Sequence, residues 1–297
     1  MSKEETAKQT QNSFKEKWHN NPGVAFKNTL DENSDIFKWI IKRNGFQTSL
    51  DFRNYLSKFN RILDGGCGNG RVTALLRSLS NDVTTEIVGI DFSSWPVAKE
   101  NLKEYKNIHI EQANLLENLE RLGRFDFIYC QEVLHHTGNP YLGFSNLVSL
   151  LNPNGEIAIY VYKLKAPIRE YTDDFIRDQI AKLPYEEAMK VCNQITDFGK
   201  ALSMDEQEID VPQLDILEIP EGKYTMQRLI YHFFMKCFWS NELSYEDNSV
   251  INYDWYHPQD CSRHTIEEVR SWFALQNLDI VHECVDFYGI TVRGKKK

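Results

Sequence analysis

The sequence predicts an α/β fold with a doubly wound, mostly parallel seven-stranded sheet, an N-terminal helical arm and a helical insert after the fifth strand. Three observations carry this prediction. Short apolar runs alternate with helical patterns over residues 56–163, which is typical of a parallel sheet covered on both faces. A glycine-rich turn follows the first of these runs. Two closely spaced apolar runs near the C-terminus indicate an antiparallel pair.

Composition agrees with a soluble enzyme. The chain has 297 residues, 41% of them hydrophobic, which is enough for one large α/β domain with an insertion or for two smaller domains. The net charge of −9 disfavours a nucleic acid or an anionic membrane as partner. The charged start is no signal peptide, no run has the length of a transmembrane helix, and the six cysteines show no Cys-x-x-Cys pattern. We therefore expect reduced thiols and a cytoplasmic location.

Residues 1–55 are expected to form the arm. A short helix is predicted over residues 11–18, and a stronger one over residues 33–42, where Ile36, Trp39 and Ile40 recur at helical spacing. Asn33 or Ser34 is available as the cap of the second helix.

Residues 56–163 are expected to form the α/β core, beginning with the strand at 61–63. This strand leads into Asp64-Gly65-Gly66-Cys67-Gly68-Asn69-Gly70, and a helix is predicted over 71–77. A strand, a glycine-rich turn and a helix in this order indicate a nucleotide site. Asp64 would repel a pyrophosphate but suits a cationic or amino-bearing ligand. The dinucleotide pattern Gly-x-Gly-x-x-Gly fails, because the third glycine would fall on Arg71 or Thr73.

Four further strands are predicted, within 86–93, 108–115, 125–136 (a strand and the loop after it) and 156–162. Ligands of such sheets lie beyond the carboxyl ends of the strands. Asp91 ends the second strand 21 positions after Gly70, near the spacing at which an acid meets a ribose in doubly wound folds. A carboxylate can accept hydrogen bonds from both hydroxyls of a cis-diol. Asn114 and Gln131 fall at the ends of the next two strands.

The complete Asp-x-Gly-x-Gly-x-Gly run resembles motif I of the class I S-adenosylmethionine-dependent methyltransferases. The segments ending in Asp91, Asn114 and Gln131, and the turn into the fifth strand, resemble later elements of that family in the same order. The resemblance implies a Rossmann-like methyltransferase fold with S-adenosyl-L-methionine as cofactor. It implies the following cofactor-binding residues: Asp64, Gly65, Gly66, Gly68, Asn69, Gly70, Asp91, Phe92, Ser93, Asn114, Leu115, Gln131 and Val133.

Residues 164–262 are expected to form the helical insert, with helices at 168–180, 185–202 and 226–239 and an acidic loop at 205–221. In the family such inserts commonly roof the substrate pocket, and arms such as 1–55 fold over the cofactor. Phe14 and Trp18 then become candidate lid residues, although aromatic residues at helical spacing are more often part of a core.

Residues 263–297 are expected to return to the core. Thr265 followed by Glu268 predicts a capped helix, and strands are predicted at 278–287 and 289–293.

Methyl transfer requires alignment of donor and acceptor and, for a hydroxyl or a protonated amine, removal of a proton. His135 and His136 follow the fourth strand and are the candidate catalytic residues, and their pKa suits a base. A hydrogen-bonded structural role is the alternative for both. Tyr160, Tyr162 and His257 are further candidates for the base.

The segment 253–264 combines aromatic, acidic and histidine side chains, which suit a sugar or another ring. It resembles segments of uncharacterised methyltransferases from polysaccharide and natural-product gene sets. A loop pinned by its own side chains is the alternative. No metal is expected from His257, Cys261 and His264, because their spacing is short and no fourth ligand is evident. The predicted substrate-binding residues are Trp255, Tyr256, His257, Tyr162 and Trp18.

We therefore expect a methyltransferase acting on a small molecule, such as a hydroxyl or amine of a sugar or natural product. Two alternatives stay open: methylation of a macromolecule such as tRNA or a protein, and a catalytically silent cofactor-binding scaffold. The sequence lacks a basic surface for RNA, and Gln131-Glu132-Val133-Leu134 stands where an Asn-Pro-Pro-Tyr-like amide motif would follow the fourth strand. The intact glycine run counts against a decayed site.

Overall fold

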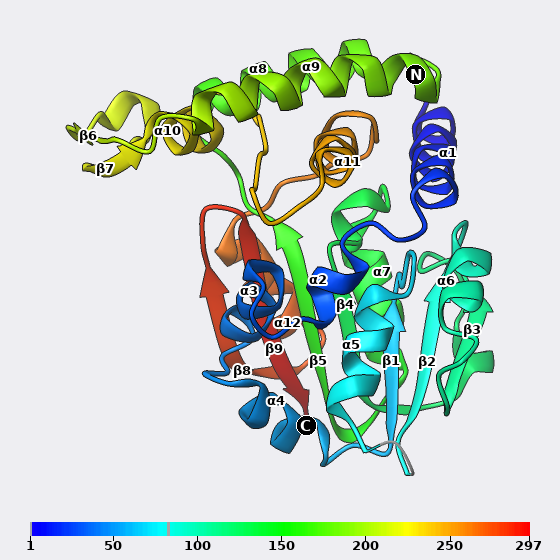
Figure 1. Ribbon diagram of the computed structural model, residues 1–297. Coiled ribbons are helices and arrows are strands. Elements are labelled where there is room, and N and C mark those ends of the chain that lie inside the picture. The colour runs from blue at the N-terminus through cyan, green and yellow to red at the C-terminus, as the bar shows by residue number, and fades with distance from the viewer. Residues whose placement is uncertain (1, 82–83) are drawn as a thin grey trace. The chain divides into compact units, whose positions relative to one another are not determined.

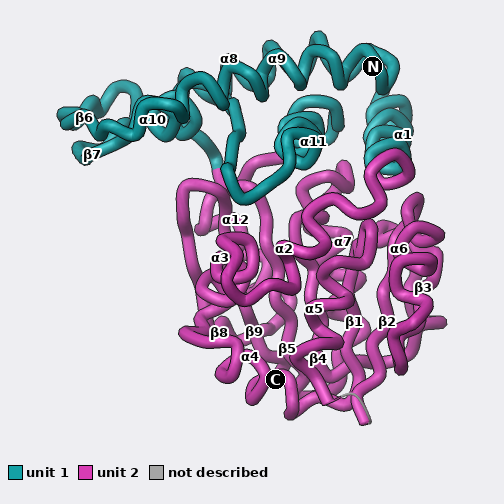
Figure 2. Tube along the Cα trace, viewed as in Figure 1, with its two compact units in different colours: residues 1–17, 164–261 teal, residues 18–163, 262–297 magenta. Residues whose placement is uncertain are grey.

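The computed structural model describes residues 2–81 and 84–297. It divides into two compact units, shown in different colours in Figure 2. The larger unit holds residues 18–163 and 262–297, and the smaller holds residues 1–17 and 164–261. The chain's first residues therefore cluster with the insert. The four functional parts expected from the sequence stay a prediction.

The larger unit is built on one seven-stranded sheet (Figure 1). Strands β1 to β5 are parallel, and β9 runs antiparallel to both β5 and β8. The spatial order is β3-β2-β1-β4-β5-β9-β8. The strands are β1 (Arg61–Gly65), β2 (Glu86–Asp91), β3 (Ile108–Gln112), β4 (Phe125–Gln131), β5 (Leu151–Tyr162), β8 (Leu278–Val285) and β9 (Gly289–Lys296). The predicted fold class is confirmed. Because β1 has β2 on one side and β4 on the other, the order reverses at the carboxyl end of β1, where ligands bind in such sheets.

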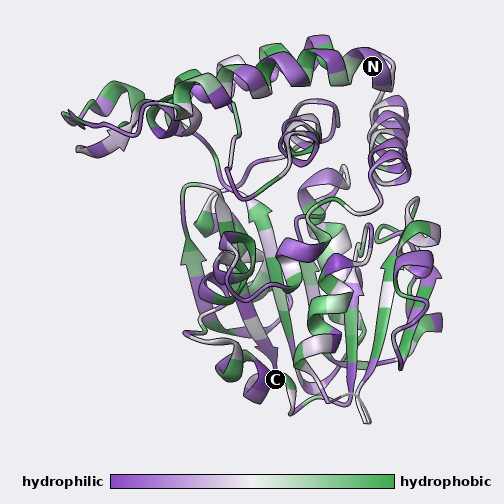
Figure 3. Cartoon of the chain, viewed as in Figure 1, coloured by the Kyte–Doolittle hydropathy of each residue, from purple (hydrophilic) through white to green (hydrophobic). Residues whose placement is uncertain are grey.

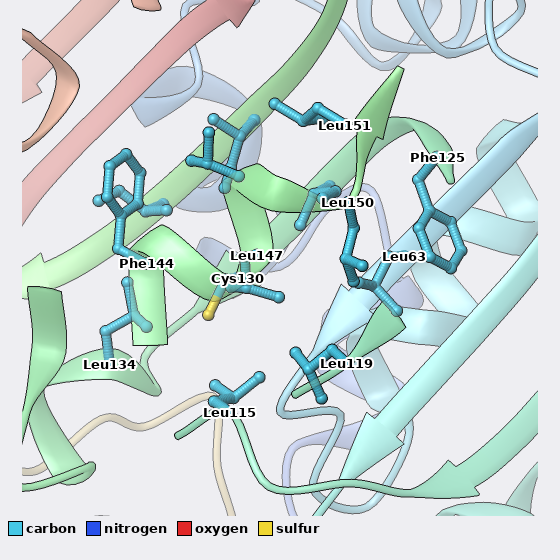
Figure 4. Close-up of a cluster of buried hydrophobic side chains, with 14 of the residues drawn as sticks. Leu63, Leu115, Leu119, Phe125, Cys130, Leu134, Phe144, Leu147, Leu150 and Leu151 are labelled. Atoms are coloured by element: carbon cyan, nitrogen blue, oxygen red, sulfur yellow. The ribbon is translucent and has the colours of Figure 1, made fainter. Parts of the chain in front are cut away.

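Both faces of the central strands β1, β2 and β4 are buried, as their apolar runs predicted. Leu63 of β1 and Ile128 of β4 belong to a core cluster on one face, which includes Phe144 and Leu147 (Figure 4). Their neighbours in the sequence, such as Ile62, belong to a second cluster. Figure 3 shows apolar residues along these strands. A sheet buried on both sides leaves only its edges and strand ends for ligands.

Helices of the larger unit are capped as their sequences predict. Ser34 Oγ accepts a hydrogen bond from Phe37 N at 3.1 Å and begins α3. Thr265 Oγ1 accepts one from Glu268 N at 3.1 Å and begins α12. The helices are α2 (Phe26–Leu30), α3 (Asp35–Arg43), α4 (Ser49–Leu56), α5 (Arg71–Leu79), α6 (Trp95–Asn101), α7 (Pro140–Ser149) and α12 (Ile266–Leu275).

The smaller unit is mainly helical, with one two-stranded sheet. It contains most of α1 (Lys3–Asn20), together with α8 (Pro167–Ile180), α9 (Tyr185–Ser203), β6 (Glu208–Val211), β7 (Gly222–Thr225), α10 (Met226–Phe233) and α11 (Tyr245–Tyr256). Helices α8 and α9 agree with the prediction, and the short helix expected at 11–18 is part of the longer α1. None of the described helices is long and apolar enough to cross a membrane.

Three local predictions for this unit are wrong. The helix predicted over 226–239 ends at Phe233, because Lys236 N donates to Asp173 Oδ1 and Phe238 N to Asn252 Oδ1 instead of to helix carbonyls. The predicted loop at 205–221 contains β6, which pairs with β7. Residues 253–256 lie in the last turn of α11 rather than in a loop.

Candidate active site

The loop between β1 and α5 depends on glycine for its backbone conformation. Gly66, Gly68 and Gly70 have φ angles of 85°, 55° and 87°, in the left-handed region that favours glycine. Gly66 N and Cys67 N both donate to Ile90 O, at 2.7 and 2.9 Å, which holds the loop against the end of β2. The glycine pattern thus produces a tight turn at the reversal point of the sheet.

Protein side chains pack where two of these glycines lack a Cβ. A Cβ on Gly66 would lie 2.4 Å from both methyl carbons of Val133, and a Cβ on Gly68 would lie 2.9 Å from the Trp18 indole. Val133 follows β4, and Trp18 is near the end of α1. The loop therefore lies directly beside two residues predicted to bind cofactor or substrate.

Asp64 ends the apolar part of β1 and is buried. Its Oδ2 accepts a hydrogen bond from Thr73 Oγ1 at 2.6 Å, and within the described ranges it forms no ion pair. Burial raises the pKa of this carboxyl to about 7, while the Thr73 hydrogen bond and the charge of Arg71 oppose that shift. A cationic group placed against Asp64 would favour its ionised form.

Asp91 at the end of β2 organises the surrounding backbone. Its Oδ1 accepts hydrogen bonds from Ser93 N at 3.0 Å and Ser94 N at 2.7 Å, and its Oδ2 accepts one from Gly68 N at 3.1 Å. A carboxylate at this position can accept hydrogen bonds from hydroxyl groups as well as from backbone donors. Asp91 thus links the turn after β2 to the glycine loop.

Gln131 at the end of β4 presents a buried donor. The Tyr129 hydroxyl accepts from Asn44 Nδ2 at 2.9 Å, so its proton is donated to Gln131 Oε1. This fixes the amide with Nε2 as the free end. Gln131 is 6% exposed, and its Nε2 has no hydrogen-bond partner in the part of the chain that the structure describes. A buried donor left unused is costly and points to a ligand acceptor.

The other predicted cofactor residues take varied positions. Phe92 is exposed after β2, and Ser93 contributes its backbone to the Asp91 turn. Asn114 Nδ2 donates to Glu117 Oε1 at 3.1 Å, and Leu115 lies in the core.

Asn69 is fully buried and anchors the glycine loop. Its Nδ2 donates to Pro22 O and Val24 O, both at 3.1 Å. Gly65 ends β1, where a Cβ would lie 3.3 Å from Leu147. Both residues support the loop from within the protein.

The structure brings His135 and Tyr162 together beyond β4 and β5. Their ring centroids are 3.7 Å apart, and His135 is completely buried. The His136 ring lies 4.3 Å from that of His135 and is only half-buried. Gln131 and Tyr160 are register partners in the sheet, which places this aromatic group one strand from the Gln131 amide.

Trp255, Tyr256 and His257 lie in the smaller unit and are all buried there. Trp255 Nε1 and the Tyr256 hydroxyl donate to the Asp173 carboxylate at 2.8 and 2.7 Å. His257 Nδ1 lies 2.8 Å from Ser13 Oγ. These side chains therefore already have polar partners within their own unit.

Sequence reasoning missed one ion pair beside the loop. Arg71 Nη2 contacts Glu132 Oε2 at 2.9 Å, and Arg71 Nη1 donates to Thr29 Oγ1 at 3.0 Å. Glu132 has a φ of 60°, which is uncommon for a residue with a side chain and occurs often at functional sites. Charged residues directly after the third glycine and directly after Gln131 were the available signal.

These groups fit S-adenosylmethionine, which carries an ammonium, a carboxylate and ribose hydroxyls. Asp64 offers a carboxyl without an ion pair among the described residues, Gln131 a buried unused donor, and Asp91 a carboxylate at the end of β2. Together with the reversal point of a seven-stranded sheet, they define a class I S-adenosylmethionine-dependent methyltransferase.

Comparison with known proteins places the chain in a family. The chain belongs to the methyltransferase domain family, whose model matches residues 56–228. It is 36% identical over 105 residues to the uncharacterized protein syc1184_c of Synechococcus, covering 34% of this chain and 25% of that protein. It is 34% identical over 105 residues to the ubiquinone biosynthesis O-methyltransferase of Dechloromonas aromatica, covering 33% of this chain and 42% of that protein. The matched segment thus spans less than half the length of either relative.

A solved structure shows the same fold along the whole chain. The 1,6-didemethyltoxoflavin-N1-methyltransferase of Burkholderia thailandensis, solved with 1,6-didemethyltoxoflavin and S-adenosylhomocysteine, superposes with a TM-score of 0.52 at 14% identity. The match covers 100% of this chain and 91% of that one.

Replacement of Asp91 is expected to affect both the cofactor and the loop. Asp91→Ala should weaken cofactor binding by about 1.5–3 kcal/mol, the scale of hydrogen bonds to a charged group. It should also lower stability, because three backbone donors lose their acceptor. Calorimetric binding and urea unfolding measure the two effects separately. Unchanged cofactor affinity in a folded variant would contradict the ribose role.

Proposed function

We propose that this enzyme transfers the methyl group of S-adenosylmethionine to a hydroxyl or amine of a small molecule. The observation that carries the proposal is the aromatic and histidine group beyond β4 and β5, beside the Gln131 amide. Rings of this kind suit a planar or cyclic acceptor. The similarity to a ubiquinone biosynthesis O-methyltransferase supports a small acceptor.

The cofactor is held by residues of the larger unit in this proposal. Asp64 faces the ammonium group, Gln131 Nε2 donates to the carboxylate, and Asp91 accepts from the ribose. Phe92, Ser93, Asn114 and Leu115 surround the adenine. When bound, the cofactor supplies an electrophilic methyl group on a sulfonium. The chain's own residues align the acceptor and exclude water.

His135 and His136 have different roles in this proposal. His135 is completely buried against Tyr162, so its ring positions the acceptor side of the site. His136 is less buried and is the residue we assign to proton removal. An imidazole has a pKa suited to accepting a proton near neutral pH.

Substitution of the histidines tests this division. His136→Ala should lower kcat by about 10²- to 10⁴-fold, the usual contribution of a general base, with cofactor affinity unchanged. His135→Phe keeps a ring against Tyr162 and should retain most of the turnover. Steady-state kinetics with the identified acceptor provide the measurement. The reverse pattern would assign the base to His135, and normal turnover in both variants would leave alignment as the main contribution.

One experiment tests the proposed function as a whole. The protein is incubated with S-adenosylmethionine labelled in the methyl group and with fractionated cell extract, beside an Asp64→Ala control. Label in the small-molecule fraction supports the proposal. Label in protein or RNA would favour a macromolecular acceptor, and bound cofactor without any transfer would favour a silent scaffold.

Several predictions from the sequence keep that status. One is that residues 164–262 form a roof over the substrate pocket. Another is that the acceptor is bound by Trp255, Tyr256, His257 and Trp18. A cytoplasmic location also stays a prediction. Alanine at Trp255 and Tyr256 would raise the KM of the acceptor more than that of the cofactor if they bind it.

A further inference from the structure

The smaller unit gathers cationic side chains around two aromatic rings. The Trp255 ring centroid lies 5.1 Å from Lys236 Nζ, 5.3 Å from Arg169 Cζ and 5.7 Å from Lys165 Nζ. The Tyr231 ring lies 4.8 Å from Arg169 Cζ and 5.7 Å from Arg228 Cζ. Arg169 thus joins the two groups into one cluster, which we call the Trp255 cluster: Lys165, Arg169, Arg228, Tyr231, His232, Lys236 and Trp255. It is drawn from α8, α10, α11 and the segments beside them.

The acidic side chains nearby, of Asp173, Glu170 and Asp254, already have partners. Asp173 uses both oxygens on four donors, namely Arg169 Nε, Trp255 Nε1, the Tyr256 hydroxyl and Lys236 N. Asp254 also acts on Lys236, but its carboxylate forms an ion pair with Lys17 at 2.7 Å. Glu170 Oε1 accepts a hydrogen bond from Lys165 N at 2.7 Å, so Asp173 and Glu170 are both bonded to residues of the cluster.

Arg177 lies beside the same ring, but its guanidinium is already bonded to other groups. It pairs with Asp174, and its Nε and Nη2 donate to Trp255 O at 3.3 and 3.1 Å. It stabilises the end of α11 and adds no free donor to the cluster.

Two cations of the cluster have unused donors. Arg228 Nη1 is buried and has no hydrogen-bond partner among the described residues. Lys236 is 6% exposed, and in residues 2–81 and 84–297 its Nζ forms no hydrogen bond or ion pair. Burying a cation without a partner is costly, and an anionic ligand bound there would offset that cost.

The pKa of His232 reflects its burial and the nearby cations. Burial, and after it the charges of Arg169, Arg228 and Lys165, together lower the pKa of its imidazole to about 3. A local excess of cations is notable in a chain whose net charge is −9.

We infer that the Trp255 cluster is a binding site for an oxyanion, the phosphate or carboxylate group of a small molecule. Arg228 and Lys236 donate to the oxyanion, because their donors are unused. Arg169 is held by Asp173 and adds charge, while the Trp255 and Tyr231 rings hold the cations in place. The inference does not depend on the proposed function, since Arg228 and Lys236 have no part in the proposed cofactor or acceptor site.

Histidine NMR of the full chain tests the site, with inorganic phosphate and acetate as separate probes at constant ionic strength. A bound anion should shift the His232 resonances in a saturable way and raise the pKa of the imidazole. Arg228→Gln and Lys236→Met should each weaken the better probe at least about tenfold, the cost of one charge-assisted hydrogen bond. Lys223→Gln removes an exposed cation of the same unit and should leave binding unchanged.

The outcomes separate the possibilities. Tighter binding of phosphate or of acetate supports the site and identifies which oxyanion it takes. No saturable shift with either probe in the wild type overturns the inference, as does equal weakening by Lys223→Gln.

Thermal unfolding shows whether the variants are still folded. A folded Lys236→Met variant should be at least as stable as the wild type, because it removes a buried cation without an ion partner. A marked loss of stability in both Lys236→Met and Arg228→Gln would instead make the cations structural and overturn the site. Cofactor binding, measured in the same samples, tests the proposed function independently.

Discussion

Replacement of Asp64 by asparagine is expected to stabilise the protein at neutral pH and to weaken cofactor binding about a hundredfold. The carboxyl is buried, and its pKa is raised to about 7. Asparagine keeps an oxygen that can accept from Thr73 Oγ1 and carries no charge to bury. The gain at pH 7 should be about 2–4 kcal/mol, from the difference between folded and unfolded pKa values. Urea unfolding measures it.

The raised pKa of Asp64 determines how the stability of the wild type changes with pH. Between pH 4 and 7 the folded protein keeps a proton on Asp64 that the unfolded chain has lost. The wild type therefore loses stability as pH rises through this range, and the asparagine variant does not lose that contribution. The difference between the two proteins should be small near pH 4 and reach its full size near pH 7. Parallel pH profiles would show that Asp64 is ionised in the free protein.

The same carboxyl should link cofactor binding to proton release. A cationic ligand favours the ionised form of Asp64, whereas Asp91 disfavours it and Arg71 favours it already. Calorimetry near pH 6 in two buffers of different ionisation enthalpy should show a proton released on binding. Asp64→Asn is the control, in which this release should disappear.

The sequence was sufficient for the parallel core because its strands are buried on both faces. Runs such as 61–63 and 86–90 consist mainly of apolar residues, and the glycines after the first run allow the positive φ angles that the turn needs. Both features depend on neighbours in the sequence. Local patterns therefore identified the fold and the cofactor loop.

Features set by distant residues could not be predicted in this way. Trp255 and Tyr256 suggested a ligand-binding loop, but their polar atoms bond to Asp173, far away in the sequence. Asp64 suggested a fixed negative charge, but burial within the folded core raises its pKa. Asn44 and Tyr129 orient Gln131 through contacts that no spacing indicates.

Alanine at Gly66 is expected to have the other large effect. The φ of 85° is strained for alanine, and the new Cβ would lie 2.4 Å from the Val133 methyl carbons. The backbone contributes about 1–3 kcal/mol and the overpacking about 1–3 kcal/mol, so stability should fall by about 2–6 kcal/mol. Cofactor binding should fall below detection, because the loop must move. Thermal unfolding and calorimetry provide the measurements.

A second substitution separates the two causes. Val133→Ala removes the methyl groups that the new Cβ would meet and leaves the φ angle unchanged. In the Gly66→Ala background it should restore about half of the lost stability, since only the overpacking is relieved. Gly23→Ala is the matched control, because nothing lies within 4 Å of a Cβ there and its φ is not in the left-handed region. If the double variant is no more stable than Gly66→Ala alone, the backbone angle rather than the Val133 contact sets the requirement for glycine.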